Sequence, residues 1–175
     1  RIIVDNIGGL TLGSGISLTL NNVTMSLLKG NVFIKPGASF VANRCEFQGN
    51  GVINCEGKAK FEYCRMTTAV KVIGGEVGFY YCRILNMCGM TIFATFNYTT
   101  KKKSNVTLKY CQIGLCGGGI LAEDSSEINA SYCIFKDDGK QSRERQQQHS
   151  HDGGNKREQE NANSISDMDN GVVLI

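Results

Sequence analysis

Hydrophobic and polar residues alternate in short runs that recur along the first 135 residues. The stretch FEYCRM at 61–66 returns as FYYCRI at 79–84, LKYCQI at 108–113 and ASYCIF at 130–135, and weaker copies, LNNVTM at 20–25 and ANRCEF at 42–47, precede it. In each copy two runs with a period of two meet at a bend, and this period is typical of β-strands. The copies therefore predict pairs of short strands joined at a corner.

The copies align into columns of residues that share one position in the repeat. The anchor column consists of Val23, Cys45, Cys64, Cys82, Cys111 and Cys133, with spacings of 22, 19, 18, 29 and 22 residues. Three more columns are almost entirely apolar: Leu18, Phe40, Ala59, Val77, Val106 and Ile128; Leu20, Ala42, Phe61, Phe79, Leu108 and Ala130; Met25, Phe47, Met66, Ile84, Ile113 and Phe135. Self-similarity at this spacing indicates a solenoid.

A second apolar set lies about 11 residues before the anchor positions and predicts a third strand in each coil. Its members are Val32, Ile34, Ile53, Val70, Val72, Ile120 and Ala122. Turn-like links follow it at 35–39, 54–58 and 123–127. Three short strands per coil of about 20 residues describe an all-β fold, the parallel β-helix.

The composition divides the chain into three parts. Residues 1–135 carry the coils. Residues 136–170 are rich in Gln, Asn and charged residues and nearly free of apolar ones, so we expect a disordered insertion. Residues 171–175, GVVLI, resemble the second apolar set of the earlier coils and predict a strand of a continuing coil. Because the chain begins and ends within strand-like patterns, we expect it to be a piece of a longer protein.

The charge is unevenly distributed. The net charge is +3, but 136–170 holds six basic and eight acidic residues, which leaves 13 basic against 8 acidic elsewhere. The longest coil predicts a protruding loop around 97–105 that carries Lys101, Lys102 and Lys103. A basic excess suits an anionic partner, although a solvated turn explains it as well. We predict no specific nucleic-acid binding, and no run of 18 or more apolar residues predicts a transmembrane segment.

Five of the eight cysteines share the anchor column, which should face the interior. Stacked strands hold neighbouring side chains about 4.8 Å apart and parallel, a poor geometry for disulfides. We therefore predict buried reduced thiols and a cytoplasmic protein, with Cys55, Cys88 and Cys116 outside the column. Four glycosylation sequons, at Asn22, Asn97, Asn105 and Asn129, argue for secretion instead. The absence of a CxxC pair gives no support for a metal site, and we predict no cofactor.

Four consecutive coils place a tyrosine directly before the anchor cysteine. This tyrosine ladder consists of Tyr63, Tyr81, Tyr110 and Tyr132. Pointing outward beside Arg65 and Arg83, it would form a flat aromatic and cationic platform for sugar rings or an extended peptide. Alternatively, the rings cover the corner and have a structural role. The sequence leaves their direction open.

The carboxylates of the coils show no catalytic arrangement. They are Asp5, Glu46, Glu56, Glu62, Glu76, Glu123, Asp124 and Glu127. Their spacing does not pair two of them with a basic residue on neighbouring coils, as polysaccharide cleavage requires. Both histidines, His149 and His151, lie in the expected disordered insertion. We therefore predict a protein that is not an enzyme.

The repeats at 77–84 and 106–113, VGFYYCRI and VTLKYCQI, resemble the C-terminal β-helix domain of the Shc-binding protein and Nessun dorma family. The copy CEFQGNG at 45–51 and the Gln/Asn-rich insertion are similar as well. The resemblance implies a right-handed, pectin-lyase-like parallel β-helix. It also implies a non-catalytic cytokinesis scaffold that binds centralspindlin components and glycans at the cleavage furrow, midbody or ring canal.

Two functions from different classes are compatible with these features of the sequence. The first is a binding module of an intracellular cytokinesis scaffold, with a solenoid face for protein or glycan contacts. The alternative is a carbohydrate-active β-helix enzyme or a fragment of a secreted adhesin. As binding residues we nominate the tyrosine ladder, Arg65, Arg83 and the lysines at 101–103.

Overall fold

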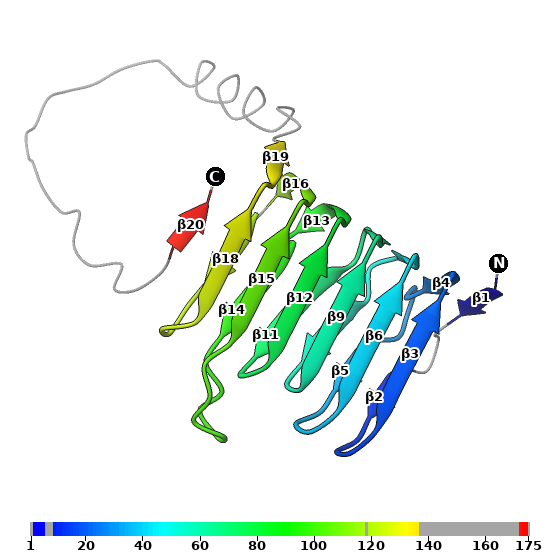
Figure 1. Ribbon diagram of the computed structural model, residues 1–175, viewed down its shortest axis with the longest axis horizontal. Helices are drawn as coiled ribbons and strands as arrows, with labels where there is room; N and C mark the ends of the chain where they lie inside the picture. Colours follow the sequence, from blue (N-terminus) through cyan, green and yellow to red (C-terminus); the bar gives the residue numbers. More distant parts are fainter. Residues whose placement is uncertain (1, 6–8, 118, 137–171, 175) are drawn as a thin grey trace, which may run out of the picture.

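The computed structural model describes residues 2–5, 9–117, 119–136 and 172–174. These residues form three sheets of short strands and include no helix. Successive strands of a coil belong to different sheets, so each coil adds one strand to each sheet (Figure 1). The result is a β-solenoid, as the repeat predicted.

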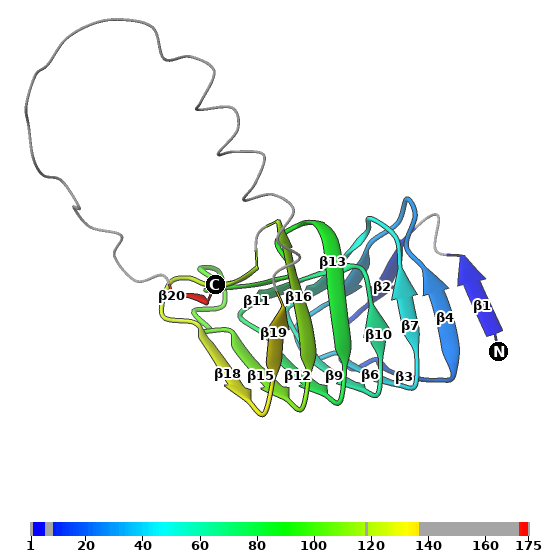
Figure 2. The ribbon, with the colours of Figure 1, turned by 90° about the horizontal axis from the view of Figure 1, so that it is seen from above.

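The three sheets are named A, B and C. Sheet A contains β1 (Ile2–Asp5), β4 (Val23–Ser26), β7 (Glu46–Gln48), β10 (Arg65–Met66), β13 (Arg83–Gly89), β16 (Gln112–Gly117) and β19 (Ile134–Lys136) (Figure 2). Sheet B contains β2 (Leu10–Leu12), β5 (Val32–Ile34), β8 (Val52–Cys55), β11 (Ala69–Ile73), β14 (Ile92–Thr95), β17 (Ile120–Ala122) and β20 (Val172–Leu174). Sheet C contains β3 (Ser17–Asn21), β6 (Ser39–Asn43), β9 (Lys58–Glu62), β12 (Glu76–Tyr80), β15 (Asn105–Lys109) and β18 (Glu127–Ser131).

The strand register reproduces the columns read from the sequence. In sheet C, Phe61 pairs with Phe79, and in sheet A, Met66 pairs with Ile84. The ladders between β1 and β19 are parallel throughout. The prediction of a parallel β-helix is confirmed. The five coils from Val23 to Cys133 average about 22 residues, slightly more than expected, because the fourth is the longest.

The core is a tube of apolar side chains enclosed by the three sheets. Its largest members are the phenylalanines Phe40, Phe47, Phe61 and Phe79, all fully buried. Phe61 and Phe79 stack with ring centroids 5.0 Å apart and planes 11° apart, as their shared column requires. Since side chains alternate across a strand, the same strands expose their polar residues to solvent.

Cys55 lies outside the anchor column, as predicted, but it occupies a second buried column of the core. Cys55 ends β8, pairs with Ile34 on one side and Val72 on the other, and is fully buried. It belongs to the apolar column of sheet B. The second apolar set also has members that the sequence reading missed, Ile92 and Ala94 of β14.

The segment after the coils is described only at β20. This strand pairs antiparallel with β17, whereas every ladder between the coils is parallel. The predicted insertion at 136–170 begins inside β19, and the remainder of it, 137–170, lies outside the described residues. Its assignment as a disordered insertion therefore stays a prediction, as does the continuing coil at 171–175.

The extra length of the fourth coil lies mainly between β14 and β15. Residues 96–104, named here the lysine loop, project beyond the corner between sheets B and C (Figure 1). Asn97 forms an isolated antiparallel bridge with Lys102 and is buried. The loop is therefore anchored at its base while its lysines are exposed.

Candidate functional site

The corner between sheets C and A has the same backbone conformation in every coil. The residue before each anchor adopts a positive φ: Asn22 56°, Arg44 53°, Tyr63 53°, Tyr81 56°, Tyr110 56° and Tyr132 55°. Its N–H donates to the next coil, as from Tyr63 to the Tyr80 carbonyl at 2.9 Å. This left-handed conformation turns the chain at the corner and directs the side chain away from the core.

The tyrosine ladder therefore points outward. The exposed fractions are 56% for Tyr63, 49% for Tyr81, 47% for Tyr110 and 78% for Tyr132. Successive ring centroids lie 5.0, 4.9 and 4.9 Å apart, and the planes differ by only 7°, 6° and 9°. The question left open by the sequence, which way the rings point, is answered by this geometry.

The ladder is a ridge, and the expectation of a flat aromatic platform is wrong. Because the rings stack along the solenoid axis, each inner ring has both faces covered by its neighbours. Only ring edges and hydroxyls face solvent, apart from the outer faces of the two end members. A sugar ring that stacks on an aromatic face finds no such face at Tyr81 or Tyr110. An extended chain can instead lie along the ridge and meet a hydroxyl at nearly every 5 Å.

The fold requires the left-handed corner but does not require tyrosine there. The first two coils make the same corner with Asn22 and Arg44. Asparagine tolerates this conformation because its short side chain bonds locally, whereas a bulky residue is strained by about 1 kcal/mol or more. Stacking offsets some of this strain, at about 0.5–1.5 kcal/mol per aromatic pair. The fold therefore does not explain why four tyrosines occupy this corner, and we attribute them to a role of the protein surface.

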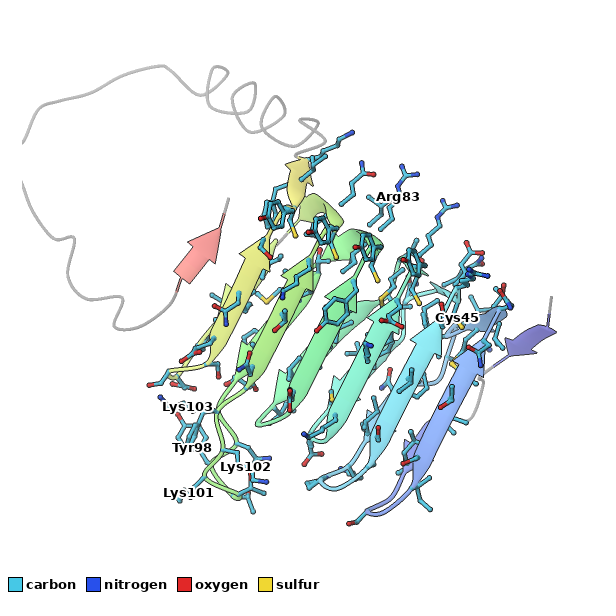
Figure 3. All side chains as sticks on the ribbon, in the orientation of Figure 1. Cys45, Arg83, Tyr98, Lys101, Lys102 and Lys103 are labelled. Atoms are coloured by element: carbon cyan, nitrogen blue, oxygen red, sulfur yellow. The ribbon has the colours of Figure 1, made fainter. Side chains whose placement is uncertain are left out.

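Two arginines flank the ridge on sheet A. Arg65 and Arg83 are register neighbours on β10 and β13, and both are exposed. Arg65 Nε lies 3.9 Å from Glu46 Oε1, whereas Arg83 forms no ion pair with another described residue. Arg83 is seen at the upper end of the sheet C strands in Figure 3. The ridge therefore has a cationic border that is only partly neutralised.

The thiol column, Cys45, Cys64, Cys82, Cys111 and Cys133, lies behind the ladder on the inner side of the same corner. Its described thiols are free. The single S–H of Cys64 is shared between the carbonyl of Ala42 in the preceding coil, 3.4 Å from Sγ, and that of Glu62, 3.3 Å from Sγ. Cys82 and Cys111 repeat this pattern one coil later each. The thiols thus satisfy carbonyls at the corner while packing as small apolar groups.

The pKa values of the thiols follow from burial and from contact between neighbours. Burial raises the pKa of Cys55 to about 12. A hydrogen bond between Cys82 and Cys111 lowers the pKa of Cys111 to about 7 and raises that of Cys82. Cys111 is only 2% exposed, so an electrophile cannot reach its sulfur from solvent. We interpret the column as structural.

A shallow cavity of about 270 Å³ lies on the outer face of sheet C and is lined by residues of β6, β9, β12 and β15. Gly78 lines this cavity, and the Tyr80 ring lies so close to it that a Cβ on Gly78 would be 2.7 Å from the ring. Lys60 Nζ lies 5.4 Å from the centroid of the same ring and 2.8 Å from Glu62 Oε1. The sequence reading missed Tyr80 and Lys60, although both occupy outward positions of the repeat.

The nominated residues do not form one site. The ladder and the two arginines lie at the corner where the sheet C strands end, whereas Lys101, Lys102 and Lys103 lie on the loop that precedes β15 (Figure 3). Tyr98 is on the same loop, and its pKa is raised because its hydroxyl hydrogen-bonds Asp124. A five-residue strand separates the two groups by roughly 16 Å.

Comparison with models of known protein families, with curated proteins and with solved structures finds no match. The resemblance to the Shc-binding protein and Nessun dorma family therefore stays a prediction. The described residues contain no cluster of three or more His, Cys, Asp or Glu that could hold a metal. Within the same part of the chain, a helix long and apolar enough to cross a membrane is not found.

Proposed function

We propose that the chain is a non-catalytic binding module that holds an extended polypeptide along the tyrosine ladder. The observation that carries this proposal is the ladder itself: four exposed, stacked tyrosines at a corner whose backbone would be served better by asparagine. Aromatic side chains fixed in one orientation lose little entropy when a partner binds, and tyrosine and arginine are enriched among energetically important interface residues.

The geometry favours an extended polypeptide over a glycan. Inner ring faces are covered, so sugar stacking is restricted to the ends of the ladder. The hydroxyl row and Arg83, which forms no ion pair among the described residues, can bind carbonyl and carboxylate oxygens of a chain that follows the ridge. In the cytokinesis setting that the resemblance implies, this chain would belong to a centralspindlin-like protein, and the protein would act in the cytoplasm at the cleavage furrow, midbody or ring canal.

The test uses ligands selected on the wild-type chain from a displayed library of random linear peptides and from a glycan array. We expect peptides to be enriched, and their affinity to fall about tenfold or more in the double variant Tyr81→Ala/Tyr110→Ala, because two anchoring rings are lost. Tyr98→Ala removes an exposed tyrosine outside the ladder and serves as the control. Thermal unfolding confirms that each variant remains folded.

Two results would contradict the proposal. One is an unchanged peptide affinity in a double variant that melts like the wild type. The other is selection of glycans alone, with binding that depends on Tyr132, whose ring has the one outer face at its end of the ladder. The second result would move the function toward carbohydrate recognition.

A further inference from the structure

A groove runs along the opposite corner, between sheets B and C, where no binding residue except the lysines was nominated. It has a volume of about 640 Å³ and crosses four successive coils, from Ser39 past Gly57 and Gly75 to Lys102 and Lys103. Three strand spacings of about 4.8 Å give it a length of about 14 Å, which fits roughly four residues of an extended peptide.

At Gly57 and Gly75 the wall of the groove has no side chain, because the coils approach too closely there. A Cβ on Gly57 would lie 2.5 Å from the Ala38 carbonyl oxygen, and one on Gly75 would lie 2.7 Å from that of Cys55. Only glycine fits at these two positions. The corner is therefore an open channel, whereas the opposite corner carries the tyrosine ridge.

The lysine loop lies at one end of the groove and is held in place by hydrogen bonds within the loop and to the preceding coil. Asn97 Oδ1 accepts from the N–H groups of Thr99 and Thr100, both at 3.0 Å. Ser104, 1% exposed, donates to the Val72 carbonyl at 2.9 Å and accepts from the Gly74 N–H at 2.8 Å. The lysines thus project from a preorganised loop, which reduces the entropy lost on binding.

The charges of the groove are balanced along its length except at the loop. Glu56 pairs with Lys35 at 2.8 Å, and Glu76 pairs with Lys58 at 3.2 Å. Lys102 and Lys103 form no ion pair with the described residues, so the excess positive charge is concentrated at this end. A ligand that matches this pattern is extended and carries its negative charge at one end.

We propose that the groove binds an extended peptide segment whose acidic side chains contact Lys102 and Lys103. A polyanion of uniform charge, such as nucleic acid or an anionic membrane surface, fits less well, because Glu56 and Glu76 border the same groove. This inference does not depend on the tyrosine ladder, which lies at the other end of the sheet C strands.

The experiment selects a displayed library of random linear peptides on the variant Tyr81→Ala/Tyr110→Ala, so that ladder ligands are excluded. We expect enriched peptides to contain clustered Asp or Glu and to bind less tightly as salt is added. Their affinity should fall about tenfold in Lys102→Ser/Lys103→Ser. It should also fall in Ser39→Trp, whose indole would fill the groove from the solvent face of β6.

The matched control is Lys101→Asn/Lys109→Ser, which removes two exposed positive charges that do not line the groove. Asparagine is chosen at Lys101 because φ is +57° there. An equal loss of affinity in the control would show a general charge effect and overturn the proposal. Enrichment of peptides without acidic residues would also overturn the proposal. So would a chain that binds no peptide but binds phosphatidylserine vesicles or duplex DNA through Lys102 and Lys103.

Discussion

The thiol column and the tyrosine ladder are adjacent in sequence but lie on opposite sides of one wall of the solenoid. Cys82 is 3% exposed and hydrogen-bonded to two carbonyls, whereas Tyr81, one residue earlier, is 49% exposed. The inner residue is constrained by volume and by the carbonyls it satisfies. The outer residue is constrained only by the left-handed backbone. Packing therefore explains the cysteines, whereas the tyrosines need a reason outside the fold.

The largest loss of stability should come from a substitution on the inner side of the wall, in the core. Phe61→Ala removes a fully buried ring that stacks on Phe79 at 5.0 Å and packs edge-on against Phe47 at 5.6 Å. Neighbouring coils hold the cavity open, so we expect a loss of about 3–5 kcal/mol in the free energy of unfolding, measured by urea titration. A loss below about 1 kcal/mol would mean that the core is loosely packed and that the contrast between the two sides is smaller than described.

The burial of Cys55 should cause a smaller loss of stability at alkaline pH. The pKa of Cys55 is about 12 in the folded chain, above its ordinary value of 9.0, because burial disfavours the thiolate. The folded state therefore keeps a proton that the unfolded state releases, so this stability is complete below pH 9 and is lost as the pH rises toward 12. Between pH 9 and 10.5 the loss should be about 2 kcal/mol.

The control for this effect is Cys55→Ser, which does not titrate in this range and can donate to the same Gly57 carbonyl. The pH dependence of the wild type should exceed that of the variant, because the two chains differ in no other titratable group. Parallel curves from urea titrations at pH 8, 9 and 10.5 would show that the Cys55 thiol is hydrated and would contradict its place in the core.

The residues of the core could be predicted because their apolar positions recur in each copy of the repeat. Phe61 and Phe79 occupy one column in the sequence and one rung in sheet C. The strand β14 was missed because the register between β13 and β16 shifts between Asn86 and Gly89, which breaks the spacing that the other coils keep. The groove could not be predicted, because it depends on the approach of coils at Gly57 and Gly75.

The alternating pattern of the sequence also did not predict whether the tyrosine side chains point inward or outward. A residue between two alternating runs can belong to either face, and the left-handed φ decides the matter. One signal was present: Asn22 occupies the same column as Tyr63, and asparagine is enriched at left-handed positions. A column that contains asparagine before a buried anchor therefore indicates an outward corner.

The smallest effect tests whether this corner strains the tyrosines. Both Tyr81→Ala and Tyr81→Asn lose the stacking on Tyr63 and Tyr110, but asparagine tolerates φ near +56° better than alanine. We expect the Asn variant to be more stable than the Ala variant by about 1 kcal/mol in urea titrations. At Tyr80, within strand β12, the same pair of substitutions should give asparagine no advantage. Equal stability of the two variants at position 81 would mean that the corner imposes no strain, and the tyrosines would then be explained by stacking alone.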